Sequence, residues 1–127
     1  PQLQNGLNGA IWAKLEGAVR GWSSGIDTLY VVTGAMPTTA TDKQIQYAQD
    51  NNGKNIAIPK YYFKALARQV GGNYQTIAFK LDHKAYGDTQ YMKYAISVSE
   101  LENMTGFTFF PSLPSEVKKT LNTSQWN

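Results

Sequence analysis

The chain has 127 residues, a formal net charge of +3 and a pI near 9.1. It contains no cysteine, which excludes disulfides and cysteine-ligated zinc. No run of about 18 apolar residues occurs, so nothing predicts a membrane span. The size suits a single domain over residues 1–127, and the small positive charge permits a polyanionic partner without requiring one.

Residues 8–20 are predicted to form an amphipathic helix. At about 100° per residue, the apolar side chains fall on one arc of this helix. Glu16 and Arg20 lie together beside that arc, and Asn8 falls within it. One amide, one carboxylate and one guanidinium would therefore project from the same side. The apolar residues of the arc are Leu7, Ile11, Leu15, Val19 and Trp22.

Two interpretations of these three polar residues are open. In the first, Glu16 and Arg20 are a solvated pair contributing about 0.2–0.5 kcal/mol, and Asn8 belongs to the helix N-terminus. This leaves an amide on the apolar side unexplained, because an unsatisfied buried amide costs about 1–3 kcal/mol. In the second interpretation, a metal ion or its hydration shell satisfies the amide of Asn8.

After this helix the chain is predicted to alternate between short strands and polar turns. A buried strand is expected at 28–33, ended by Gly34. The polar residues 37–55 predict a long surface loop with a helical turn at 44–49. This loop is either a variable insertion or the border of a substrate groove. Further strands are expected at 56–67, 76–81 and 93–98, with a hairpin turn at 71–73 and a loop at 83–90.

Two short helices are predicted near the C-terminal end. Ser99 and Glu102 have the spacing of a capping box, and Gly106 is expected to end this helix in the left-handed conformation. Pro114 suits the first turn of a last helix that ends near residue 121. The tail is expected to be frayed, with Trp126 as its anchor. Three aromatic residues are expected to pack under the first of these helices: Phe107, Phe109 and Phe110.

Strands that follow one another through hairpins, with helices segregated from them, predict an α+β fold with an antiparallel sheet flanked by helices. The sequence shows no internal repeat, linker or second domain. It also contains no glycine-rich phosphate loop, HExxH motif or Cys/His metal cluster.

Four segments carry a further signal in the order of the chain. They are Asn8-x3-Trp12-x2-Leu15-Glu16-x3-Arg20, the strand Leu29 to Gly34, Ile58-Pro59-x3-Phe63-Lys64, and the region from Val98 to Pro114. The first resembles the metal-binding helix of the DNA/RNA non-specific endonucleases, which are ββα-metal (His-Me finger) nucleases. The others resemble that family's next strand, its IP-x-x-x-aromatic-K segment and its closing helix and turn. The resemblance covers nearly the whole chain.

The resemblance implies metal-dependent hydrolysis of phosphodiester bonds in DNA and RNA without sequence specificity. Asn8 would be a direct ligand of Mg²⁺ or of another divalent cation such as Mn²⁺, since hard cations prefer oxygen ligands. Glu16 would hold a water of the cation's shell, and Arg20 would hydrogen-bond the phosphate. A secreted or periplasmic location is implied by the resemblance alone.

The family's Arg-Gly-His segment, which carries its histidine base, has no counterpart in these residues. His83, the only histidine, follows Leu81 and Asp82 and is interpreted as a surface residue. The first residue is Pro1 rather than Met, which suggests that an upstream segment has been removed. We therefore expect a fold that is incomplete at its N-terminus, an upstream segment of the same protein as partner, and an inactive isolated chain.

The alternative is a non-catalytic module that binds nucleic acid or a protein partner, and a degenerate nuclease with a structural role is a third hypothesis. In the alternative, aromatic side chains of the sheet would stack on single-stranded bases beside positive charge. An aromatic stripe is more often part of a core. The sequence does not indicate an oligomeric state. The candidate stacking residues are Tyr61, Tyr62, Phe63, Lys64 and Arg68.

Overall fold

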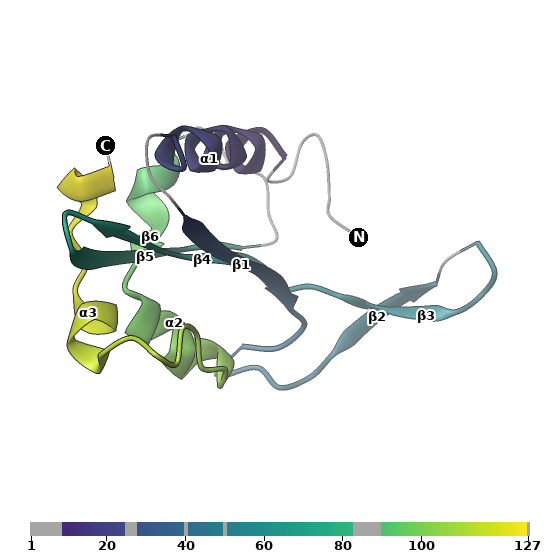
Figure 1. Cartoon of the computed structure of the whole chain (residues 1–127). Coiled ribbons are helices and arrows are strands. Elements are labelled where there is room, and N and C mark those ends of the chain that lie inside the picture. Colours follow the sequence, from purple (N-terminus) through teal and green to yellow (C-terminus); the bar gives the residue numbers. More distant parts are fainter. Residues whose placement is uncertain (1–8, 25–27, 40, 50, 83–89, 127) are drawn as a thin grey trace.

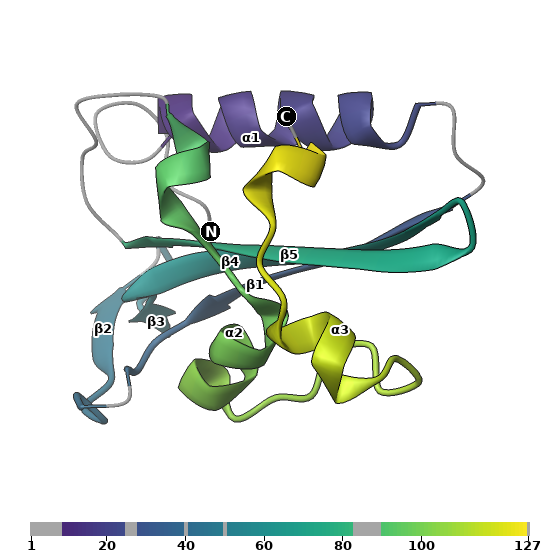
Figure 2. The ribbon, with the colours of Figure 1, turned by 90° about the vertical axis from the view of Figure 1, so that its left-hand side faces the viewer.

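The computed structural model describes residues 9–24, 28–39, 41–49, 51–82 and 90–126. They form the predicted α+β fold, in which one antiparallel sheet has helices on both faces (Figures 1 and 2). The helix α1 (Gly9–Trp22) covers one face, and α2 (Val98–Thr105) and α3 (Ser115–Lys119) lie on the other. None of the helices in these ranges is long and apolar enough to span a membrane.

The main sheet has the strand order β1–β4–β5–β6 and is antiparallel throughout. The turn between β4 and β5 consists of Gly71 and Gly72, whose φ angles are 60° and 83°. Two positive φ angles are what a two-residue hairpin turn needs, so the turn predicted at 71–73 is confirmed. The four strands are β1 (Leu29–Met36), β4 (Tyr61–Val70), β5 (Asn73–Asp82) and β6 (Ala95–Ile96).

Strand β1 differs from the prediction in both length and burial. It continues through Gly34 to Met36, because Gly34 lies opposite Phe63 and leaves room for that ring. A Cβ atom at Gly34 would be 2.5 Å from Cζ of Phe63. The strand is also not buried, since Tyr30 is 56% exposed. Within the described residues, no strand pairs with the outer edge of β1.

Replacing Gly34 by alanine should destabilise the protein by about 1–3 kcal/mol, because the ring of Phe63 must move to admit the methyl group. Gly21→Ala in α1 is the matched control, since nothing lies within 4 Å of the position its Cβ would take. The control should be neutral or slightly stabilising. Urea unfolding of both variants measures the difference, and equal stabilities would contradict the close contact.

The strands β2 (Gln46–Gln49) and β3 (Asn55–Ile58) form a separate ribbon that projects from the body of the molecule (Figure 1). The helical turn predicted at 44–49 is therefore wrong, and the predicted loop at 37–55 is in part this ribbon. All of β2 is exposed to solvent. Because both faces of β2 are exposed, its residues show no apolar alternation and predicted a loop. The strand expected at 56–67 is divided between β3 and β4, which lie in different sheets.

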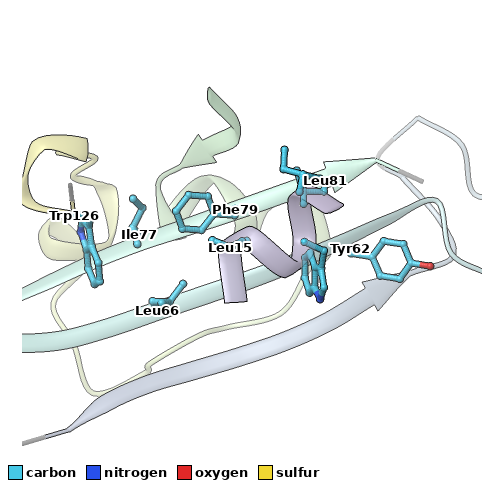
Figure 3. Packing of buried hydrophobic residues seen from close by; sticks show 9 residues of the cluster. Leu15, Tyr62, Leu66, Ile77, Phe79, Leu81 and Trp126 are labelled. Atoms are coloured by element: carbon cyan, nitrogen blue, oxygen red, sulfur yellow. The ribbon is translucent and has the colours of Figure 1, made fainter. Parts of the chain in front are cut away.

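The face of the sheet under α1 holds the larger apolar cluster. Side chains of β4 and β5 point from the sheet toward α1 (Figure 3). Trp126, from the short helix η2 (Thr123–Trp126), completes this cluster and is only 1% exposed. The prediction that Trp126 anchors the tail is therefore confirmed, but residues 123–126 form a helix instead of being frayed. The cluster consists of Ile11, Trp12, Leu15, Tyr62, Leu66, Ile77, Phe79, Leu81 and Trp126.

The opposite face holds a second cluster beneath α2, built from Tyr61, Phe63, Ala65, Ala78, Val98, Leu101 and Phe109. Successive residues of β4 therefore alternate between two cores. Tyr61, Tyr62 and Phe63 are all buried, which contradicts their proposed role as a stacking platform for single-stranded bases. The aromatic stripe packs the fold on both sides of the sheet.

The strand predicted at 93–98 is mostly wrong. A short helix, η1 (Tyr91–Tyr94), precedes the two residues of β6, and the chain then leaves the sheet because Ser97 caps α2. The Oγ of Ser97 accepts a hydrogen bond from the backbone N–H of Glu100 at 3.1 Å. Ser99 was the predicted cap, but each of these serines has a glutamate three residues later. The sequence thus contains the capping signal twice, and the chain uses the earlier one.

Glu102 links α2 to α3 instead of capping a helix. Its Oε2 accepts hydrogen bonds from Nζ of Lys118 at 3.0 Å and from the backbone N–H of Phe109 at 2.8 Å. Gly106 ends α2 with a φ of 79°, as predicted. Phe109 is buried as expected, whereas Phe107 is largely exposed and does not pack under α2.

Candidate active site

Helix α1 places Glu16 and Arg20 on its solvent side. Ile11 and Leu15 are buried against the sheet, as predicted, and their burial fixes the rotation of the helix. Residues four apart on a helix lie on the same side, so the side chains of Glu16 and Arg20 leave α1 together. Both residues are exposed, and a ligand in solvent can therefore reach a carboxylate and a guanidinium from one direction.

A buried lysine lies beneath Glu16. The Lys64 side chain is 6% exposed, whereas the Glu16 side chain is 48% exposed. Nζ of Lys64 lies 3.8 Å from Oε2 of Glu16 and donates a hydrogen bond to Oγ1 of Thr33 at 2.9 Å. It also lies 4.9 Å from the centre of the Trp12 ring. One ammonium group therefore connects the carboxylate on α1 with strands β4 and β1.

Burial lowers the pKa of Lys64 below its ordinary value, because the ammonium loses hydration, and the Glu16 carboxylate partly offsets this effect. The folded protein thus binds this proton less tightly than the unfolded chain does. Lys64 consequently reduces stability at neutral pH. That reduction disappears as the pH rises from the lowered pKa to the value in the unfolded chain.

Replacing Glu16 by glutamine should lower the pKa of Lys64 further, since the charge that favours the ammonium is removed. An NMR titration of the Cε resonance of Lys64 measures this shift. Glu100→Gln is the control, because Glu100 lies on α2, which covers the other face of the sheet. An unchanged Lys64 pKa in the Glu16 variant would contradict the electrostatic link between the two residues.

The guanidinium of Arg20 lies near Gly17, one turn back along α1: a Cβ atom on that glycine would be 3.7 Å from Nη2. In the ranges that the structure describes, no side chain forms a hydrogen bond or ion pair with this guanidinium. A planar guanidinium can hold a phosphate through two parallel hydrogen bonds. Arg20 therefore has the chemistry of an anion-binding residue.

Asn8, the predicted metal ligand, and His83 both lie outside the described residues. Among the residues that are described, no group of three or more histidine and carboxylate side chains gathers as a metal site would need. The carboxylate of Glu16 is exposed on α1 and is the kind of oxygen donor that a hard cation or its bound water prefers. The charge of Glu16 is already partly neutralised by Lys64. This carboxylate is therefore better suited to hold a water molecule bound to a cation than to ligate the cation directly.

In the sequence, Lys64 belongs to a family motif and to the set of candidate stacking residues, and neither pattern predicts that it lies beside Glu16. The available signal was the alternation of β4, in which Lys64 stands between Tyr62 and Leu66 on one face. A charged residue on an otherwise apolar face is expected to be paired, because lysine is almost never fully buried without a partner. Its partner on α1 follows only from the packing of the helix.

Residues 1–116 match the family model of the DNA/RNA non-specific endonucleases. The chain belongs to this family. It is 30% identical over 117 residues to Nuclease C1 of Cunninghamella echinulata var. echinulata, in a match that covers 89% of this chain and 46% of that protein. It is also 30% identical over 115 residues to the mitochondrial nuclease EXOG of Mus musculus, in a match that covers 84% of this chain and 31% of that protein.

Among solved structures, the fold is similar to that in the crystal structure of the EndoG/EndoGI complex, with a TM-score of 0.69 and 18% sequence identity. The match covers 92% of this chain and 50% of that chain. The fold predicted from the sequence, that of the ββα-metal nucleases, is thereby confirmed. This member of the endonuclease family spans half or less of the length of the relatives named here.

Proposed function

We propose that the full-length protein is a metal-dependent endonuclease that hydrolyses phosphodiester bonds of DNA and RNA without sequence specificity. One observation supports this proposal in a chain of the DNA/RNA non-specific endonuclease family. The buried residues Ile11 and Leu15 fix the rotation of α1, so that Glu16 and Arg20 face solvent together. Asn8 directly precedes the start of this helix in the sequence. The three residue types match the chemistry that such a reaction needs.

Asn8 would hold Mg²⁺ or Mn²⁺, and the bound cation would supply positive charge for the phosphate and the leaving oxygen. Glu16 would accept a hydrogen bond from a water of the hydration shell and so orient that water. Arg20 would donate hydrogen bonds to the phosphate oxygens and stabilise the charge that develops in the transition state. Contacts of this kind are made to the backbone of the nucleic acid, so they select no base sequence.

The attacking water also needs a proton acceptor, and we place this general base in a part of the full-length protein outside these 127 residues. The relatives are at least twice as long as the part that this chain matches, which leaves ample length for such a segment. The outer edge of β1 is the proposed docking place for a strand of that segment. The apolar side chains of Tyr30 and Val32, both partly exposed on β1, would then be covered.

The test is cleavage of supercoiled plasmid DNA and of an unstructured RNA by the full-length protein, with Mg²⁺ and with excess EDTA. We expect nicking and cleavage of both substrates with Mg²⁺ and neither with EDTA. Binding of nucleic acid without any cleavage would support the alternative of a non-catalytic binding module. Cleavage that persists in EDTA would contradict the metal-dependent mechanism.

A secreted or periplasmic location is proposed from the family resemblance alone. Several relatives are named as mitochondrial nucleases, including those of Schizosaccharomyces pombe and Saccharomyces cerevisiae, so a mitochondrial location is the competing hypothesis. Fractionation of the producing cells tests the proposal. Recovery of the protein in the cytosolic fraction would contradict it.

A further inference from the structure

We propose that Lys64 is a positioning residue of this active site. Its ammonium group holds the carboxylate of Glu16 in place at the surface of α1. The inference rests on the proposed function and extends it to a residue beneath the helix. Lys64 projects from the centre of the sheet, two residues from each of its buried neighbours Tyr62 and Leu66 on the same face.

A lysine is a costly residue at this place. An ammonium removed from water loses free energy of hydration that only an opposite charge and hydrogen bonds can restore. A methionine would fill a similar volume between Tyr62 and Leu66 without this loss. The position therefore indicates a task that needs a positive charge under α1, and the nearby opposite charge is that of Glu16.

Three contacts fix the ammonium between the helix and the sheet. Thr33 accepts its hydrogen bond at 2.9 Å, the Trp12 ring lies 4.9 Å away, and Oε2 of Glu16 lies 3.8 Å away. Trp12 and Glu16 are one turn apart on α1, so Lys64 lies beneath both of them. At 3.8 Å the contact with Glu16 is an ion pair and not a short hydrogen bond, which leaves the carboxylate oxygens open to water.

Lys64 itself does not offer a surface to the substrate. Its side chain is almost fully buried, and Trp12, which packs beside its ammonium, is buried as well. Glu16, whose carboxylate lies 3.8 Å from Nζ of Lys64, is half exposed. We therefore expect the influence of Lys64 on the reaction to pass through Glu16.

A double-mutant cycle in the full-length protein tests this dependence. Lys64→Met should lower the single-turnover cleavage rate at saturating substrate about 10- to 100-fold, with little change in the substrate concentration that gives half the maximal rate. In a Glu16→Gln background the same substitution should change the rate little, because residues that act through one another are not additive. Lys64→Arg, which keeps the charge, should restore part of the rate.

Lys80→Met is the matched control. Lys80 also forms an ion pair, with Asp82 at 2.9 Å, and also lies over an aromatic ring, at 5.0 Å from the centre of Tyr61. It projects from β5 on the face opposite α1, since its partner in register is Phe63. The rate of this variant should stay at the parental level. If Lys64→Met does not fold, Thr33→Val removes the hydroxyl group that accepts the bond from Nζ and should lower the rate in its place.

A second readout does not depend on activity. In metal-free protein, ¹³C relaxation should show a more mobile Glu16 side chain in Lys64→Met but not in Lys80→Met. The proposal would be overturned if Lys64→Met lowered the cleavage rate equally in the parental and the Glu16→Gln backgrounds. It would also be overturned if the mobility of the Glu16 side chain were unchanged in Lys64→Met. If Glu16→Gln alone leaves the rate unchanged, the assigned role of Glu16 fails instead, and the relaxation data still decide whether Lys64 orders this side chain.

Discussion

Replacing Arg20 by alanine in the full-length protein is expected to lower the rate of phosphodiester cleavage about 10²- to 10³-fold. The reason is the loss of a preorganised donor aimed at the charge that develops on the phosphate. A lysine at this position should restore only part of the rate, because an ammonium lacks the planar pair of donors. Single-turnover cleavage of a labelled duplex at fixed Mg²⁺ measures both variants.

The matched control for Arg20→Ala is Lys14→Ala. Lys14 is a cation on the same helix and is also exposed, but it lies roughly 200° round from Glu16. This variant should keep the parental rate. A parental rate in Arg20→Ala would contradict the assignment of this side of α1 as the active site, and equal losses in both variants would point to general damage to the helix.

The isolated chain of 127 residues is expected to cleave nucleic acid at least about 10²-fold more slowly than the full-length protein. The proposed cation site and Arg20 would still bind a phosphate, but a positioned proton acceptor typically contributes a factor of about 10²–10⁴. Plasmid nicking with Mg²⁺ measures the difference, and circular dichroism shows whether the chain has folded.

Complementation is the control for that comparison. Adding the remaining part of the full-length protein should restore cleavage, because we expect it to supply the general base and to pair with the free edge of β1. Strong cleavage by the isolated chain, abolished by His83→Ala, would contradict this. It would show that the only histidine of these residues is the base.

The parts of the fold that the sequence predicts well are those set by local patterns. Ile11 and Leu15 recur with the period of a helix, and the burial of α1 follows from that spacing. The hairpin at Gly71 and Gly72 follows in the same way, because two adjacent glycines permit the positive φ angles of its turn. In each case a few neighbouring residues carry the whole signal.

The errors arise where distant residues decide the outcome. Gly34 predicts the end of a strand, yet β1 continues because the ring of Phe63 needs the space that a glycine leaves. Ser97 and Ser99 carry the same local capping signal, so only the packing of α2 selects between them. The pairing of β2 with β3 leaves no trace in the hydrophobic pattern, because both faces of β2 are exposed.

The candidate site shows the same division. The spacing of Glu16 and Arg20 predicts that they share one side of α1, and this needs no knowledge of the sheet. The position of Lys64 beneath Glu16 depends on how α1 crosses β4, and no local pattern contains that crossing. The part of the site that lies on one helix was therefore predictable, and the part that joins helix and sheet was not.

Asn8, which directly precedes α1 in the sequence, is proposed to hold the metal ion of the nuclease. Binding of Mn²⁺ to the full-length protein, measured by electron paramagnetic resonance, tests this claim. The parental protein and Asn5→Ala should bind Mn²⁺ in competition with Mg²⁺, and Asn8→Ala should lose this binding while keeping its folded circular dichroism spectrum. Unchanged Mn²⁺ affinity in Asn8→Ala would contradict the claim.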